Sequence, residues 1–185
     1  MKDFKHTEVD ATDRRILSAL QQDATRSAAD IADIVHLTAT TCWRRITQLE
    51  RRGVIKRRVA LLDHNALGLN LVVFAHVKLS SQGRDALAKF ELAIGDCPEV
   101  LGCYTIMGDW DFLLHIVARD IRHYEAFYLD HLSRIPFVQS VSSSMVMTIV
   151  KETTAIPLGD DHKVKGRHST RAERRRGPPQ YNNHP

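Results

Sequence analysis

Three short segments in the first third of the chain carry apolar residues at helical spacing. In the first segment, Ile16, Leu17 and Leu20 share one face, and either Asp10 or Thr12 can cap the start of the helix. Polar and charged residues occupy most of the other positions. The pattern predicts an amphipathic helix that buries one side and exposes the other.

The next two helices have clear start and end signals. Ser27 and Asp30 have the offset of a capping box, which predicts a second helix from Ser27. A third helix is predicted from Thr38, and Gly53 is expected to follow its end. Trp43 is expected to pack beneath the helices. The inner face of the third helix carries Cys42, Ile46 and Leu49.

The pattern changes after residue 53. A strand is predicted over residues 54–62, and the turn residues of 63–70 predict a connector. Strict alternation over Leu71–Leu79 then predicts a strand, and further strands are expected over 100–107, 112–118 and 138–150. Two helices lie between them, the second capped by Asp120. Their predicted inward residues are Leu87, Phe90 and Ile94 in one, and Ile121, Tyr124, Tyr128 and Leu132 in the other.

The order of elements in the second half is β-α-β-β-α-β, which is the ferredoxin-like arrangement. The fold class is therefore α+β, with an N-terminal winged helix-turn-helix before this sheet. Two helices can cover only one face of the sheet. Because Val72 and Phe74 are apolar and lie on the other face, we expect that face to pack against a second copy, at about 25 cal/mol per Å² of apolar area buried.

The chain is expected to divide into four parts. Residues 8–62 form the winged helix-turn-helix domain, 63–70 the linker, and 71–156 the domain with the ferredoxin-like order. From residue 157 to 185 the sequence has almost no apolar content and is basic, so a disordered tail is expected.

Positive charge is concentrated in two islands, although the net charge is only +4. Arg44–Arg58 holds seven Lys or Arg against one acid, and His162–Pro185 holds the same ratio. The remainder of the chain is acidic. Local positive charge of this kind suits neutralisation of DNA phosphates, and the tail is one candidate for added non-specific affinity.

The third helix carries residues suited to reading DNA. Arg pairs with guanine and Gln with adenine in the major groove, while flanking cations contact phosphates. A solvated basic helix is the competing interpretation. The predicted DNA-binding residues are Thr38, Thr40, Thr41, Arg44, Arg45, Gln48, Arg51, Arg52, Lys56, Arg57 and Arg58.

These features together resemble the Lrp/AsnC, or leucine-responsive (feast/famine), family of transcriptional regulators. The resemblance covers residues 8–153 and is carried by Asp13–Leu17, by Thr38–Gly53 and by Gly108–Leu114. The chain departs from the family pattern at Ala39 and Thr41, where prolines are common, and in its basic tail. The resemblance implies a C-terminal RAM domain that dimerises through its sheet, with dimers assembling into tetramers or octamers.

The resemblance also implies a small effector, usually an amino acid, that changes DNA binding or assembly. Gly108–Asp111 is the candidate site, since a glycine permits close approach of a ligand and Asp109 or Asp111 could accept from an α-ammonium group. An ordinary hairpin turn is the alternative. The predicted effector-binding residues are Tyr104, Met107, Gly108, Asp109, Trp110, Asp111, Ser142 and Ser144.

Other classes of function receive less support from the sequence. The ten histidines invite a metal site, but His123 and His131 are too far apart on one helix to share an ion, and His115 has no patterned partner. Some sirohaem decarboxylases resemble the same two-domain architecture. A sensor that binds only protein partners is a third alternative. No catalytic residues and no cofactor are expected, and the partners are double-stranded DNA, an effector and a second copy.

The apolar runs, the N-terminal stretch and the cysteines of the sequence indicate the cellular compartment. The sequence has no apolar run of about 18 residues, so no membrane partner is expected, and the N-terminus lacks the apolar stretch of a signal peptide. The three cysteines form no CxxC pair, which is typical of a reducing compartment. A cytoplasmic regulator is therefore expected.

Overall fold

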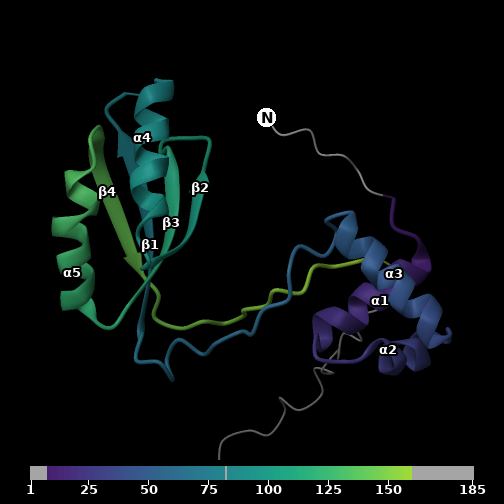
Figure 1. The fold of residues 1–185 in the computed structure, drawn as a ribbon. Helices are drawn as coiled ribbons and strands as arrows, with labels where there is room; N and C mark the ends of the chain where they lie inside the picture. Colours follow the sequence, from purple (N-terminus) through teal and green to yellow (C-terminus); the bar gives the residue numbers. More distant parts are fainter. Residues whose placement is uncertain (1–7, 82, 160–185) are drawn as a thin grey trace, which may run out of the picture. The chain divides into compact units, whose positions relative to one another are not determined.

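The computed structural model describes residues 8–81 and 83–159 and divides into two compact units. The first comprises the chain up to Arg58 together with the segment that begins at Thr154, and the second comprises Val59–Thr153 (Figure 1). The chain therefore leaves the first unit and returns to it. Most of the expected basic tail, residues 160–185, lies outside the described residues.

The first unit is built from three helices, α1 (Ala11–Gln22), α2 (Ala28–Val35) and α3 (Ala39–Arg51). Each begins at a polar N-cap, because a side-chain oxygen there accepts a bond from an otherwise unpaired N–H of the first turn. The caps are Asp10, Ser27 and Thr38, and Ser27 and Asp30 form the predicted capping box. The start signals read from the sequence are confirmed.

The helices of the first unit share one apolar core. Ile16, Ile31 and Cys42 are fully buried in it, one from each helix. Gly53, at a φ of +72°, follows the end of α3 as predicted, in the left-handed region that glycine adopts at low cost. The buried faces follow the helical periodicity except in α2, where the spacing predicts Ile31, Ile34 and Val35 on the inner face and Ile34 is instead 46% exposed.

The second unit is a four-stranded antiparallel sheet in the order β2-β3-β1-β4. The strands are β1 (Leu71–Leu79), β2 (Val100–Thr105), β3 (Phe112–Ala118) and β4 (Val138–Met145), and the helices are α4 (Arg84–Gly95), α5 (Ile121–Asp130) and the short η1 (Leu132–Arg134). Consecutive strands β2 and β3 pair directly, and β1 lies between β3 and β4 (Figure 1). This is the predicted ferredoxin-like order.

The core of the second unit lies on one face of this sheet. Alternate residues of β1 and β3 are buried there, including Val73, Leu114 and Ile116, and they pack against Phe90 of α4 and Phe127 of α5. The opposite face carries neither helix, and we call it the bare face. Its residues include Phe74, His76 and His115.

Three details differ from the sequence predictions. No strand forms over 54–62, because a strand needs a hydrogen-bonded partner and the described residues of the first unit offer none. The last strand ends at Met145, not Val150. The helix α5 turns Tyr124 and Phe127 inward, and Ile121 is exposed.

No helix within residues 8–81 and 83–159 is both long enough and apolar enough to cross a bilayer.

Replacing Asp10, the N-cap of α1, tests how this helix is held. The Asp10 carboxylate accepts from the Asp13 N–H at 2.7 Å and binds Arg45, and these bonds lower its pKa from the ordinary 3.8. Asp10→Ala is expected to reduce the free energy of unfolding by about 1 kcal/mol at pH 7. Urea unfolding monitored by circular dichroism measures it.

The pH dependence follows from the direction of that shift. A lowered pKa stabilises the fold above pH 3.8, and the contribution disappears as the pH falls through the folded-state value. The difference between Asp10→Ala and the unmodified chain should therefore shrink in acid. Thr12→Ala, the alternative cap from the sequence, serves as the control. A loss with Thr12→Ala equal to that with Asp10→Ala would contradict the assignment.

Candidate DNA-binding surface and effector site

Helix α3 has two sharply different sides. Cys42, Ile46 and Leu49 are buried, with exposed fractions of 5% or less. The opposite side repeats every four residues through Thr40, Arg44 and Gln48, all of them exposed. Because an α-helix has 3.6 residues per turn, these three lie on one solvent-facing stripe, to which Arg51 also belongs. The stripe offers one hydroxyl, two guanidinium groups and one amide.

The first turn of α3 uses two of the predicted DNA-binding residues for its own cap. The Thr38 hydroxyl accepts from the Thr41 N–H at 3.3 Å and donates to the Thr41 hydroxyl at 2.9 Å. Thr38 is exposed and Thr41 is half-buried. Thr40 has no such bond within the described residues.

Arg45 is half-buried, and its guanidinium group binds residues of the first unit. One of its guanidinium nitrogens, Nη1, donates to Asp10 at 2.7 Å and to Asp13 at 2.8 Å. Asp13 is buried, with only 6% of its surface exposed, and the hydrogen bonds that Arg45 donates to Asp10 and Asp13 raise the pKa of Arg45. The structure therefore places this predicted DNA reader in a contact between α3 and the start of α1.

Two further predicted phosphate contacts also have internal partners. Arg52 donates to the Glu8 carbonyl, and Arg58 donates to Glu50 at 3.0 Å. Within the island Arg44–Arg58, the cations with no hydrogen bond or ion pair to another residue of 8–81 and 83–159 are Arg44, Arg51, Lys56 and Arg57. All four are exposed. The positive island Arg44–Arg58 thus contains two groups of cations: those bonded to other residues of the first unit, and those that remain free to bind DNA phosphates or bases.

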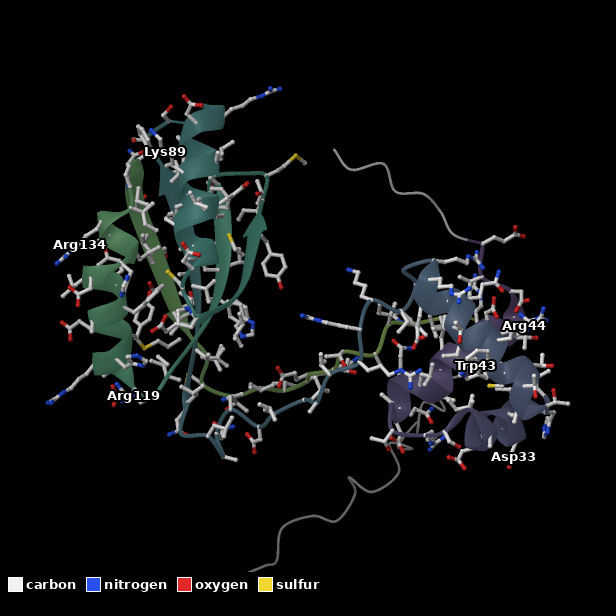
Figure 2. All side chains as sticks on the ribbon, in the orientation of Figure 1. Asp33, Trp43, Arg44, Lys89, Arg119 and Arg134 are labelled. Atoms are coloured by element: carbon white, nitrogen blue, oxygen red, sulfur yellow. The ribbon has the colours of Figure 1, made fainter. Side chains whose placement is uncertain are left out.

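Trp43 does not pack beneath the helices, so the prediction for it was wrong. Its side chain is on α3 next to Arg44 and is 61% exposed (Figure 2). Helical geometry explains the difference, because position 43 lies about 100° from the buried stripe that Cys42 and Ile46 define. A large exposed indole beside a cationic stripe adds apolar contact area to this surface.

The candidate effector loop joins β2 to β3. The Ile106 N–H donates to the Asp111 carbonyl at 3.0 Å, which closes the loop, and Gly108 has a φ of +132°, where side chains are strained. Met107 and Asp109 are exposed, and Trp110 is half-buried, with its ring 5.9 Å from that of His76.

The two aspartates of the loop have different environments. Asp111 is buried: its carboxylate accepts from the Leu79 N–H at 2.7 Å, and its own N–H donates to the Val77 carbonyl at 2.9 Å. Asp111 therefore fastens the loop to β1. Asp109 is exposed and has no hydrogen bond or ion pair within the described residues, so its carboxylate is available.

The other predicted effector residues, Tyr104, Ser142 and Ser144, lie on the bare face of the sheet. Register places Tyr104, Leu113, His76 and Ser142 in one row across the sheet, and Gly102, His115, Phe74 and Ser144 in the next. The Tyr104 ring covers Gly102, where an added Cβ would come within 2.8 Å of the phenol oxygen. The rows combine aromatic rings with hydroxyl groups.

A pocket of about 470 Å³ lies on the bare face. The stacked rings of Phe74 and His115, with centroids 5.0 Å apart, form part of its wall, together with Val72 and Val117. The segment after β4 closes one side, and the Val146 N–H donates to the Val72 carbonyl at 2.9 Å. Sequence reasoning left His115 without a partner. The alternation of β1 and β3 was the available signal, since it puts these residues on one face.

The described part of the chain contains no candidate metal-binding site. Residues 8–81 and 83–159 contain no group of three His, Cys, Asp or Glu side chains that could hold an ion. His123 instead lies 3.7 Å from Glu99, and its Nδ1 accepts from the Arg119 N–H.

A helix-turn-helix with a free cationic stripe, joined to a ferredoxin-like sheet with a pocket, defines a DNA-binding regulator with a separate ligand-binding domain. Residues 9–50 match the AsnC-type helix-turn-helix domain, and residues 72–156 match the Lrp/AsnC ligand binding domain. The chain belongs to the Lrp/AsnC family of transcriptional regulators. It is thus related to DNA-binding regulators and not to enzymes.

Individual relatives agree with this assignment. The chain is 35% identical to the DNA-binding transcriptional activator DecR of Escherichia coli, over 81% of this chain and 99% of DecR. It is 37% identical to the glutamate uptake regulatory protein of Zymomonas mobilis, over 81% of this chain and 91% of that protein.

Solved structures give the same result. An AsnC family transcriptional regulator from Agrobacterium tumefaciens matches with a TM-score of 0.78 and 41% identity, over 81% of this chain and 97% of that one. A transcriptional regulator from Neisseria meningitidis, solved in complex with L-Met, matches with a TM-score of 0.79 and 33% identity, over 82% and 98%.

The internal role of Arg45 gives a stability prediction. Arg45→Ala leaves the buried Asp13 carboxylate without its cation, so the free energy of unfolding should fall by about 2 kcal/mol. Arg44→Ala, one position away on the exposed stripe, should change it by less than about 0.5 kcal/mol. Thermal and urea unfolding of both variants measure this contrast. Equal stability of the two variants would show that the Arg45 contact contributes nothing.

Proposed function

We propose that the chain reads the major groove of double-stranded DNA with the exposed stripe of α3. Thr40, Arg44 and Gln48 supply the base contacts, and the flanking cations Arg51, Lys56 and Arg57 bind phosphates. The observation that carries this proposal is the exposed stripe itself. These side chains have no partners within the described residues, whereas neighbouring arginines of the same island do.

The internal bonds of the remaining residues support a division of labour. Arg45, Arg52 and Arg58 hold the unit together, and Thr38 and Thr41 start the helix. We infer that these five act on DNA by positioning α3, and that the predicted set of eleven DNA-binding residues contains two functional groups.

We propose that a second copy covers the bare face of the sheet. This face exposes Phe74 and Tyr104 and has no helix over it. A dimer related by two-fold symmetry would present two α3 helices to DNA half-sites about one helical turn apart. We propose that such dimers assemble further into tetramers or octamers. We also propose a cytoplasmic location, because DNA and free thiols occur together there.

The effector is proposed to be an amino acid. A relative is named as a glutamate uptake regulator, and a neighbour of known structure holds L-Met. In this chain the Gly108–Asp111 loop supports the proposal, because Asp111 fixes the loop to β1 and leaves Asp109 free to accept from an α-ammonium group. Trp110, Met107, Tyr104 and the Ser142 and Ser144 hydroxyls complete the proposed set.

DNA reading by α3 is tested with Arg44→Ala. The duplex is one selected by the unmodified chain from random sequences, and binding is measured by fluorescence anisotropy. Loss of a bidentate base contact should weaken binding to this duplex about tenfold, with a smaller loss on a scrambled duplex. Arg26→Ala, which changes an arginine of the same unit outside α3, is the control. Unchanged discrimination in Arg44→Ala would overturn the assignment of α3.

The effector proposal is tested by thermal shift with a panel of amino acids that includes L-Met and L-Glu. A ligand present at about 100 times its Kd adds about 2.7 kcal/mol and raises the Tm by several degrees. Asp109→Asn should abolish the shift and leave the Tm of the free protein unchanged. Asp85→Asn, at an exposed acid of α4, should retain it. No shift with any amino acid would contradict the proposal.

A further inference from the structure

Trp43 is a large apolar side chain that the first unit leaves in solvent. Its exposed fraction is 61%, and it belongs neither to the core of the unit nor to the partly buried side chains packed against that core. Within residues 8–81 and 83–159, no ring, cation or hydrogen bond holds the indole. Among the large apolar side chains of α1, α2 and α3, only Ile34 is also exposed, at 46%. Packing within the unit therefore does not account for a tryptophan at position 43.

The position of Trp43 along α3 puts the indole on the part of the helix that a DNA groove admits. Trp43 is the fifth of the 13 residues of α3, and the N-terminal half of a recognition helix is the part that enters the major groove. Helical side chains lean toward the N-terminus of their helix, over the residues three and four positions earlier. For Trp43 these residues are Thr40 and Ala39, which are both small and exposed. The indole therefore extends toward the start of α3.

The charge around Trp43 favours the same partner. Residues 39–47 contain Arg44 and Arg45 and no carboxylate. Arg45 is bonded within the first unit, whereas Arg44, the next residue after Trp43, is exposed and makes no bond to another residue of 8–81 and 83–159 (Figure 2). DNA offers a partner to each of these neighbours, because its grooves carry acceptor groups for a guanidinium and apolar groups for an indole.

The chemistry of the major groove decides which base suits an indole. Among the groups that specify a base pair there, only the 5-methyl group of thymine is apolar, and the others are hydrogen-bond donors and acceptors. An indole face placed over a donor or acceptor removes that group from water without giving it a partner, which costs free energy. The same face placed over a methyl group buries apolar area on both sides. Thymine is therefore the base that Trp43 fits.

We propose that the Trp43 indole packs against the 5-methyl group of a thymine in the major groove and is a specificity-determining residue of α3. Consecutive Cα atoms are about 3.8 Å apart, close to the ~3.4 Å rise of a base pair, so this thymine lies within about two base pairs of the base that Arg44 bonds. Arg44 and Gln48 read hydrogen-bonding groups, and Trp43 adds the reading of an apolar one. This inference rests on the proposed function of α3 as a DNA reader.

Replacement of thymidine by deoxyuridine tests this contact, because the change removes only the methyl group. Each thymine of the selected duplex is replaced in turn, and binding is measured by fluorescence anisotropy. At one position of the site, the replacement should weaken binding of the unmodified chain about three- to fourfold, as for one buried methyl group. Trp43→Ala should bind the natural duplex about tenfold more weakly and show no response to deoxyuridine at that position. Equal responses in the two proteins at every thymine would overturn the proposal.

Ile34→Ala is the matched control, since it removes the other exposed large apolar side chain of the three helices from a position outside α3. This variant should keep the full response to deoxyuridine, and its losing the response as Trp43→Ala does would overturn the proposal. Trp43→Phe keeps an aromatic face and should retain a response of about twofold. Because both positions are exposed, each variant should melt within about 4 °C of the unmodified chain, as checked by circular dichroism.

Intrinsic fluorescence gives a second measurement, because the chain has only two tryptophans, Trp43 and Trp110. Saturation with the selected duplex should quench the emission of the unmodified chain and shift it to shorter wavelength as water leaves the indole. Trp43→Phe, in which Trp110 is the remaining tryptophan, should show no such change. Unchanged emission of the unmodified chain at saturation would overturn the contact. A change in emission without any response to deoxyuridine would place the indole against the sugar-phosphate backbone and overturn the reading of thymine.

Failure of the thymine contact and failure of DNA reading by α3 give different results. If α3 does not read DNA, Arg44→Ala will keep full discrimination between the selected duplex and a scrambled one. If α3 reads DNA without the indole, Arg44→Ala will lose discrimination while Trp43→Ala keeps the deoxyuridine response of the unmodified chain.

Discussion

The contact of Arg45 with Asp10 and Asp13 is the constraint on which the DNA-binding unit depends. It joins α3 to the start of α1, where Asp10 is also the N-cap and Asp13 is buried. A buried carboxylate without a cation is costly, so the position of α3 is set by electrostatics as well as by apolar packing. The free stripe of α3 is defined by the side of the helix that this contact leaves exposed.

The second unit obeys a different constraint, which is the two-residue period of β1. Its inward residues fill the core, and its outward residues meet their neighbours on β3 and β4 in register, so Phe74 stacks on His115. Both the pocket and the proposed dimer surface follow from this alternation. Asp111 then fastens the effector loop to the same strand. Strand β1 therefore supports both the effector loop and the pocket on the bare face.

Local signals in the sequence predicted much of this structure. Caps, capping box, helix faces and the bounds of β1 and β3 follow from residue type and spacing, since they depend on neighbours within one element. The prediction went wrong where a partner decides the outcome: residues 54–62 form no strand without one to pair with. Likewise, helical spacing puts Arg45 beside the buried Cys42 and Leu49, but its partners Asp10 and Asp13 could not be predicted, because they are about thirty residues earlier in the chain.

The segment that begins at Thr154 has a consequence for how the protein is made, because Gln21 and Arg14 of α1 bond its Ile156 and Leu158 carbonyls and Leu158 packs against the core of the first unit. Domains generally fold in order from the N-terminus during synthesis, yet the first unit of this chain includes residues that the ribosome adds after the whole sheet. The nascent helix-turn-helix therefore lacks Leu158 in its packing until the whole sheet has been translated. A chain that ends prematurely within the sheet carries the three helices without Ile156 and Leu158, so the described contacts of the first unit are complete only after residue 158 has been added.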